Sequence, residues 1–63
     1  MSYTIDGNTY TLEEIQDILS GIGNPSSDLQ EAALDIQEAI DRGEYYGCDK
    51  WSFYSSKWLT VYA

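Results

Sequence analysis

The sequence has no histidine, one cysteine, one proline and no lysine or arginine before residue 42. Without histidine, the commonest general base of enzymes is missing and a Cys-His nucleophile pair is impossible. The single cysteine, Cys48, cannot form a disulfide within the chain, which suits a reducing compartment, and we expect it to be a small buried side chain. These absences argue against an enzyme.

Long apolar runs are also missing. No segment approaches the roughly 18 apolar residues that span a bilayer. The N-terminal stretch "MSYTIDGNTYT" has neither the basic start nor the apolar run of a signal peptide. We therefore expect a cytoplasmic protein without membrane contact.

Motifs that bind cofactors or metals are absent as well. There is no G-x-S-x-G elbow or phosphate-binding glycine loop, and "DGNTYTLE" lacks the ligand spacing of an EF-hand. Glu13 and Asp17 share a helix face at i, i+4 and predict at most weak, adventitious cation binding. We expect no cofactor and no structural metal.

The composition of the chain is that of a folded domain. Of its 63 residues, 43% are hydrophobic and 14% aromatic, unlike an acidic disordered tail. At this length about 60% of the unfolded surface is buried, so the core is small. We predict a single domain over residues 1–63.

Negative charge is concentrated in the first two-thirds of the chain. The net charge is −8; residues 1–41 hold nine acids and no cation, whereas residues 42–63 hold three cations and two acids. Direct binding to nucleic acid or to an anionic membrane requires lysine and arginine, so both are improbable. A basic protein is the partner that this charge favours.

The first half of the chain predicts a hairpin and a helix. Asp6-Gly7 suits a tight turn between two short strands, with Tyr3 and Ile5 on one strand face and Tyr10 on the partner strand. Thr11 and Glu14 form a capping-box pattern that begins a helix. Its apolar positions recur at helical spacing: Leu12, Ile15, Leu19 and Ile22.

A second helix follows a loop that contains Gly21, Gly23 and Asn24-Pro25. Ser27 with Gln30, or Asp28 with Glu31, would cap its start, and Gly43 after Arg42 would end it. The side that faces the core is expected to contain Leu29, Ala32, Ala33, Ile36, Ala39 and Ile40.

The tail "EYYGCDKWSFYSSKWLTVYA" fits two patterns. Alternating bulky residues predict a second hairpin around "SSK". Trp51, Tyr54, Trp58 and Leu59 also fit helical spacing, so a short helix before a final strand is the alternative. Strand propensity favours the hairpin. The predicted fold class is α+β, in the order ββααββ, with a small antiparallel sheet packed against two helices.

The second helix carries an acidic face opposite its apolar one. Like charges three or four positions apart repel, so this arrangement reduces stability in a small domain. A solvated face that only keeps the protein soluble is the simpler reading, but the first helix repeats the pattern. Together the acids define a candidate partner-binding surface made of Asp28, Glu31, Asp35, Glu38 and Asp41 with Glu13, Glu14 and Asp17.

A row of carboxylates can imitate a row of phosphates and enter a basic groove that normally binds nucleic acid. A tight inhibitor also needs apolar anchors. Leu34 is one candidate, because it points among the acids. One or two exposed tyrosines are the other candidate anchors. We expect both tryptophans in the core, with most of the remaining aromatic residues of the tail, which are Tyr45, Tyr46, Phe53, Tyr54 and Tyr62.

The combination of small size, strong acidity and mixed α/β structure resembles the small inhibitors encoded by phages and mobile elements, such as anti-CRISPR, anti-restriction and DNA-glycosylase-inhibitor proteins. The resemblance is one of type and rests on no specific motif. It implies non-catalytic obstruction of a defence nuclease or CRISPR surveillance complex inside the host cell, through nucleic-acid mimicry or by another route.

The alternative is a structural or regulatory interaction module. In that reading the aromatic C-terminal strands, ending in "WLTVYA", pair with another copy or a host subunit. The sequence leaves open whether the protein is a monomer or a homodimer.

Overall fold

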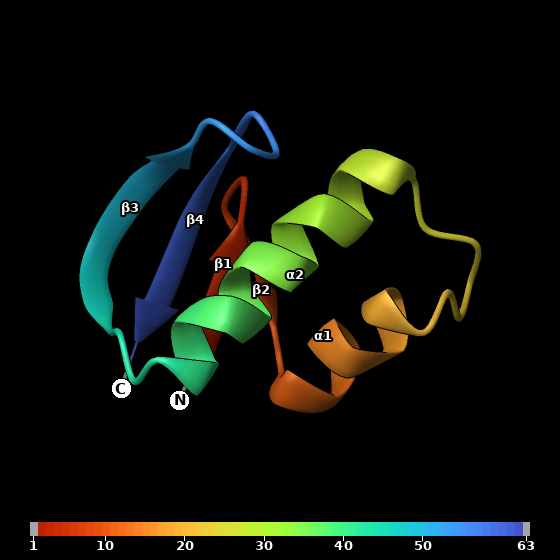
Figure 1. Cartoon of the computed structure of the whole chain (residues 1–63), viewed down its shortest axis with the longest axis horizontal. Helices are drawn as coiled ribbons and strands as arrows, with labels where there is room; N and C mark the ends of the chain where they lie inside the picture. The colour runs from red at the N-terminus through yellow and green to blue at the C-terminus, as the bar shows by residue number, and fades with distance from the viewer. Residues whose placement is uncertain (1, 63) are drawn as a thin grey trace.

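The computed structural model describes residues 2–62, and its two helices lie on the same side of a four-stranded sheet (Figure 1). The strands are β1 (Ser2–Ile5), β2 (Asn8–Tyr10), β3 (Tyr46–Ser52) and β4 (Lys57–Tyr62). The helices are α1 (Leu12–Leu19) and α2 (Ser27–Asp41). All strand pairs are antiparallel, so the predicted α+β class is confirmed.

The order of strands across the sheet is β2-β1-β4-β3. The two hairpins therefore meet through β1 and β4, an arrangement that the order of elements along the chain does not specify. Tyr3 lies opposite Val61 and Ile5 opposite Leu59. Because side chains alternate along a strand, these four point to the same face, towards the helices.

The first hairpin and the start of α1 form as predicted. Asp6 (φ 49°) and Gly7 (φ 81°) both have the positive φ that a tight two-residue hairpin turn requires. Thr11 Oγ1 accepts a hydrogen bond from the Glu14 amide, and Glu14 Oε1 accepts one from the Thr11 amide. This reciprocal pair is the capping box.

The predicted apolar face of α1 is partly wrong. The helix ends at Leu19, so Ile22 lies beyond it and is exposed, and Leu12 at its first position is exposed too. Ile15 and Ile18 are the side chains that α1 buries. The positive φ of Gly21 (82°) belongs to the turn that follows the helix, which is why helical spacing fails at Ile22.

The N-cap of α2 lies one residue before Ser27 and two before Asp28, the two predicted caps. Ser26 is the N-cap, and its hydroxyl accepts a hydrogen bond from the Leu29 amide at 3.2 Å. At the other end Arg42 is the C-cap and Gly43 has a φ of 70°, the left-handed conformation that glycine adopts readily after a helix.

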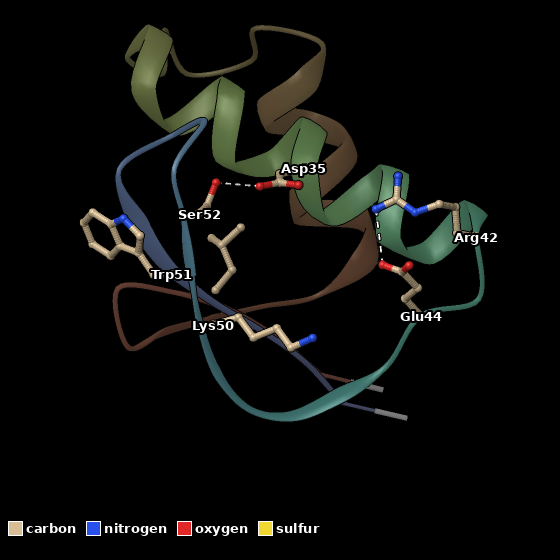
Figure 2. Close-up of a pocket in the computed structure, with 7 residues that line it drawn as sticks. Asp35, Arg42, Glu44, Lys50, Trp51 and Ser52 are labelled. Atoms are coloured by element: carbon tan, nitrogen blue, oxygen red, sulfur yellow. Dashed lines mark hydrogen bonds and ion pairs between the residues drawn. The ribbon is translucent and has the colours of Figure 1, made fainter.

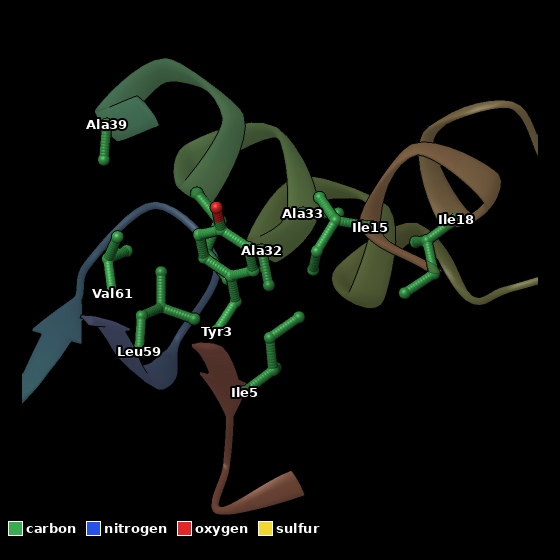
Figure 3. Close-up of a cluster of buried hydrophobic side chains, with 10 residues drawn as sticks. Tyr3, Ile5, Ile15, Ile18, Ala32, Ala33, Ala39, Leu59 and Val61 are labelled. Carbon is green, nitrogen blue, oxygen red and sulfur yellow. The ribbon is translucent and has the colours of Figure 1, made fainter. Parts of the chain in front are cut away.

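The core lies between the helices and the sheet (Figure 3). α2 contributes three alanines and one isoleucine, so its backbone can approach the sheet closely. The buried hydrophobic side chains are Tyr3, Ile5, Ile15, Ile18, Ala32, Ala33, Ile36, Ala39, Leu59 and Val61.

The C-terminal hairpin is confirmed, but its aromatic side chains are not core. Trp51 and Trp58 are 41% and 49% exposed, and Tyr45, Phe53 and Tyr54 are exposed as well. Cys48 is also exposed, contrary to expectation. The side chains of Tyr46 and Tyr62 lie outside the described part of the structure. The reason is the single helical layer: the face of the sheet that carries Trp51 and Trp58 has no helix over it.

Within residues 2–62, neither helix combines the length and apolar character that crossing a membrane requires.

Candidate functional site

The outward side of α2 carries most of the predicted acidic surface. The helix buries Ala32, Ala33, Ile36 and Ala39, and its opposite side bears carboxylates at spacings of three, seven and three residues. Asp28, Glu38 and Asp41 are exposed, and Glu31 is partly buried. We call Asp28, Glu31, Glu38 and Asp41 the α2 acidic row.

Asp35 does not belong to this row. It is partly buried and turned towards the end of β3, where its Oδ2 accepts a hydrogen bond of 2.6 Å from the hydroxyl of Ser52 (Figure 2). The prediction that Asp35 is a freely presented carboxylate is therefore corrected. Its position beside Ile36 places it at the border of the apolar face, close enough to reach the sheet.

Two members of the row have partners within the chain. Glu38 lies 3.9 Å from the guanidinium of Arg42, and Asp41 accepts a hydrogen bond of 3.1 Å from Gln37. Arg42 is closer to Glu44, at 3.2 Å, and the hydrogen bond and charge of that carboxylate are the main causes that raise the pKa of Arg42. These are exposed contacts of small energetic weight.

The acids of α1 differ from one another in their roles. Glu14 is engaged in the capping box and Glu13 stands beside it in the first turn, where negative charge is favourable. Asp17 is partly buried in the middle of the helix. α1 packs alongside α2 (Figure 1), so both acidic helices belong to the same layer of the molecule.

Leu34 lies where the sequence places it, 40% exposed on the outward side of α2. It borders a shallow depression between the two helices, together with Leu19, Gln30 and Glu31. Gln30 spans the helices by donating a hydrogen bond from Nε2 to the carbonyl of Ile18, at 3.3 Å. Leu34 is therefore an exposed apolar side chain beside the carboxylate of Glu31.

A second depression, of about 190 Å³, separates the end of α2 from β3 (Figure 2). Its walls carry charges of both signs, from Asp35, Arg42, Glu44 and Lys50, with Ser52, Trp51 and Leu59 completing it. It is smaller than the about 300 Å³ at which small-molecule pockets begin.

The turn between β1 and β2 contacts β4 through Asp6. Asp6 Oδ1 accepts a hydrogen bond of 3.0 Å from the amide of Trp58, and its other oxygen lies 3.3 Å from Lys57 Nζ. The hydrogen bond from the Trp58 amide is the main cause that lowers the pKa of Asp6, and Lys57 adds to it.

The feature that sequence reasoning missed is an exposed aromatic cluster on the helix-free face of the sheet. Trp51 lies directly opposite Trp58 in the β3–β4 pair, with ring centroids 5.3 Å apart at 65°. Phe53, 90% exposed, lies edge-on to Trp51 at 6.5 Å. The alternation along β4 could have revealed this cluster. Leu59 and Val61 are apolar and point to the core, so Trp58, between them and the turn, must point to the other face.

No set of three or more acidic or cysteine side chains in the described residues is arranged to hold a metal ion. Comparison of the chain with protein-family models, with curated proteins and with solved structures finds no match.

Proposed function

We propose that this protein is a non-catalytic inhibitor that binds a basic surface of a nucleic-acid-binding protein and blocks its access to nucleic acid. The observation that carries the proposal is the α2 acidic row: Asp28, Glu31, Glu38 and Asp41 on one rigid helix, with Leu34 between them. A phage-encoded inhibitor of a defence nuclease or CRISPR surveillance complex, acting in the host cytoplasm, is the class that fits best.

Electrostatics supports competition with nucleic acid. The row is held by a helix whose other side is packed against the core, so its backbone is already ordered and only the side chains lose freedom when it meets a basic groove. Its charge would accelerate association and make binding salt-sensitive. Asp35 is left out of the row, because it is partly buried and turned towards β3, where it accepts the Ser52 hydrogen bond.

The test is a tagged pull-down from host lysate, eluted with a salt gradient, in the presence and absence of a short DNA duplex. The double variant Glu31→Gln with Glu38→Gln should elute at lower salt and associate about three- to tenfold more slowly. A matched control, Asn8→Lys with Ser20→Lys, changes the net charge equally at exposed positions away from the row. Capture that resists salt and excess DNA, and is equal in both variants, would contradict the proposal.

A second candidate function is a regulatory or structural interaction module that pairs through β3, because β4, which carries the "WLTVY" segment, lies between β1 and β3 and has no free edge. One observation favours it: β3 is an edge strand, exposed over Gly47–Trp51. Sedimentation of the purified protein distinguishes the two, because a strand-paired homodimer persists at high salt. Val61 and Leu59 are unsuitable for mutational tests, since both are buried and a charge there would unfold the domain.

A further inference from the structure

The helix-free face of the sheet has a composition of its own. One row across the strands holds Trp51 and Trp58; the next holds Thr60, which is buried, with Thr4 and Thr9. The hydroxyl of Thr60 donates a hydrogen bond to the exposed Asp49, which stands two residues before Trp51 on β3. We call Asp49, Trp51, Phe53 and Trp58 the aromatic face.

No lysine or arginine stands among the described side chains of this face. Lys50 and Lys57 alternate onto the other side of the sheet, where Lys50 borders the depression beside Asp35 and Lys57 borders one beside Leu29. The aromatic face therefore combines exposed π-rings, one carboxylate and the negative field of a chain with net charge −8.

From this combination we propose that the aromatic face binds an arginine-bearing segment of the same basic partner. A guanidinium stacks on tryptophan more favourably than an ammonium does, and it can also donate to a carboxylate such as Asp49. A second copy of this chain is a poor occupant, because it would bring another charge of −8 to the interface. Nucleic acid is repelled for the same reason.

The placement of the face deepens the proposed function, on which this inference rests. The α2 acidic row and the aromatic face lie on opposite sides of the molecule, since α2 covers the side of the sheet that carries Leu59 and Val61 (Figure 1). One flat surface cannot contact both. The partner that fits is a basic cleft with two walls, one against α2 and one presenting arginine to Trp51 and Trp58.

Binding of model peptides tests the inference directly, because Trp51 and Trp58 are the only tryptophans and report on their own surroundings by fluorescence. The probes are two capped peptides of equal length and charge, one of alternating glycine and arginine and one of alternating glycine and lysine. We expect tryptophan emission to change on binding, and the arginine peptide to bind about three- to tenfold more tightly.

Variants separate the two surfaces. Trp58→Leu keeps an apolar side chain but removes the ring, so it should abolish the preference for arginine; Trp51→Leu is the second variant if the first does not fold. Glu31→Gln with Glu38→Gln should weaken the binding of both peptides alike and leave the ratio of the two affinities unchanged.

If the wild-type protein binds the arginine and lysine peptides with equal affinity and its tryptophan emission does not change, the inference is overturned while the proposed role of the α2 acidic row stands. A tryptophan-dependent dimer on sedimentation would overturn it too. Loss of salt-sensitive binding to both peptides would overturn the proposed function instead.

Discussion

The hydroxyl of Ser52 ties the end of β3 to Asp35 on α2. It donates to Asp35 Oδ2 at 2.6 Å and accepts from the Ser55 amide at 3.1 Å, so one side chain orders both the helix–sheet contact and the β3–β4 turn. Ser52 is only 7% exposed, and a polar group left without its partner at such a place is costly.

Ser52→Ala should therefore lower the free energy of unfolding by about 1–3 kcal/mol. In a domain of this size, each kcal/mol of lost stability lowers the Tm by about 4–8 °C. Asp35→Asn, which keeps an acceptor oxygen but loses the charge, should cost less. Thermal denaturation by circular dichroism measures both; an unchanged Tm in Ser52→Ala would show that the bond contributes nothing.

The stability contributed by Asp6 should depend on pH. Its pKa is lowered in the folded state, chiefly by the Trp58 amide, so its contribution is complete above the unfolded pKa of about 3.9 and is lost as pH falls through the lower folded value. Asn tolerates the positive φ of this position (49°), so Asp6→Asn removes the titration and preserves the turn.

Titrating both proteins from neutral pH to below pH 4 and measuring urea denaturation isolates this group from the other carboxylates. The wild type should lose its advantage over Asp6→Asn in the acid range. Parallel curves would contradict a lowered pKa.

The capping box should make Thr11 important for α1. Thr11→Ala removes the acceptor for the Glu14 amide and should cost about 0.5–2 kcal/mol. Thr11→Ser retains a hydroxyl and serves as the control. If both variants denature at the wild-type urea concentration, the cap has no energetic role.

Neutralising the acidic row should have opposite effects on stability and binding. Glu31 lies three residues after Asp28 and four before Asp35, so Glu31→Gln relieves repulsion and should stabilise the fold by about 0.2–0.5 kcal/mol per relieved pair. Added salt should raise the Tm of the wild type more than that of the variant, because it screens the same repulsion. A lower Tm for Glu31→Gln at low salt would refute this account.

Local patterns in the sequence predicted the elements well. The Asp6-Gly7 turn, the Thr11–Glu14 cap and the alanine-rich face of α2 depend on neighbouring residues, and all three are confirmed. The pairing of β1 with β4 depends on segments at the two ends of the chain, so periodicity could not supply it.

The acidic site could be predicted only in outline. Helical spacing places Glu31, Leu34 and Glu38 on the outward side of α2, but it could not show that Ser52 would reach Asp35. The two tryptophans were assigned to the core because a short chain has few large side chains to bury. The structure builds its core mostly from alanine and isoleucine, with Tyr3, Leu59 and Val61, and leaves both tryptophans outside it, since the two helices cover one face of the sheet.

The pairing of β1 with β4 has a consequence for how the protein is made. Ile5 and Leu59 are partners in the sheet, yet nearly the whole chain separates them, so the ribosome releases one long before the other. Closing so large a loop delays the contact. The N-terminal hairpin and both helices can form during synthesis, but the sheet that buries them assembles only after β4 has emerged. A nascent chain stalled before Lys57 should remain open to proteases, and protection should appear abruptly once the last strand is released.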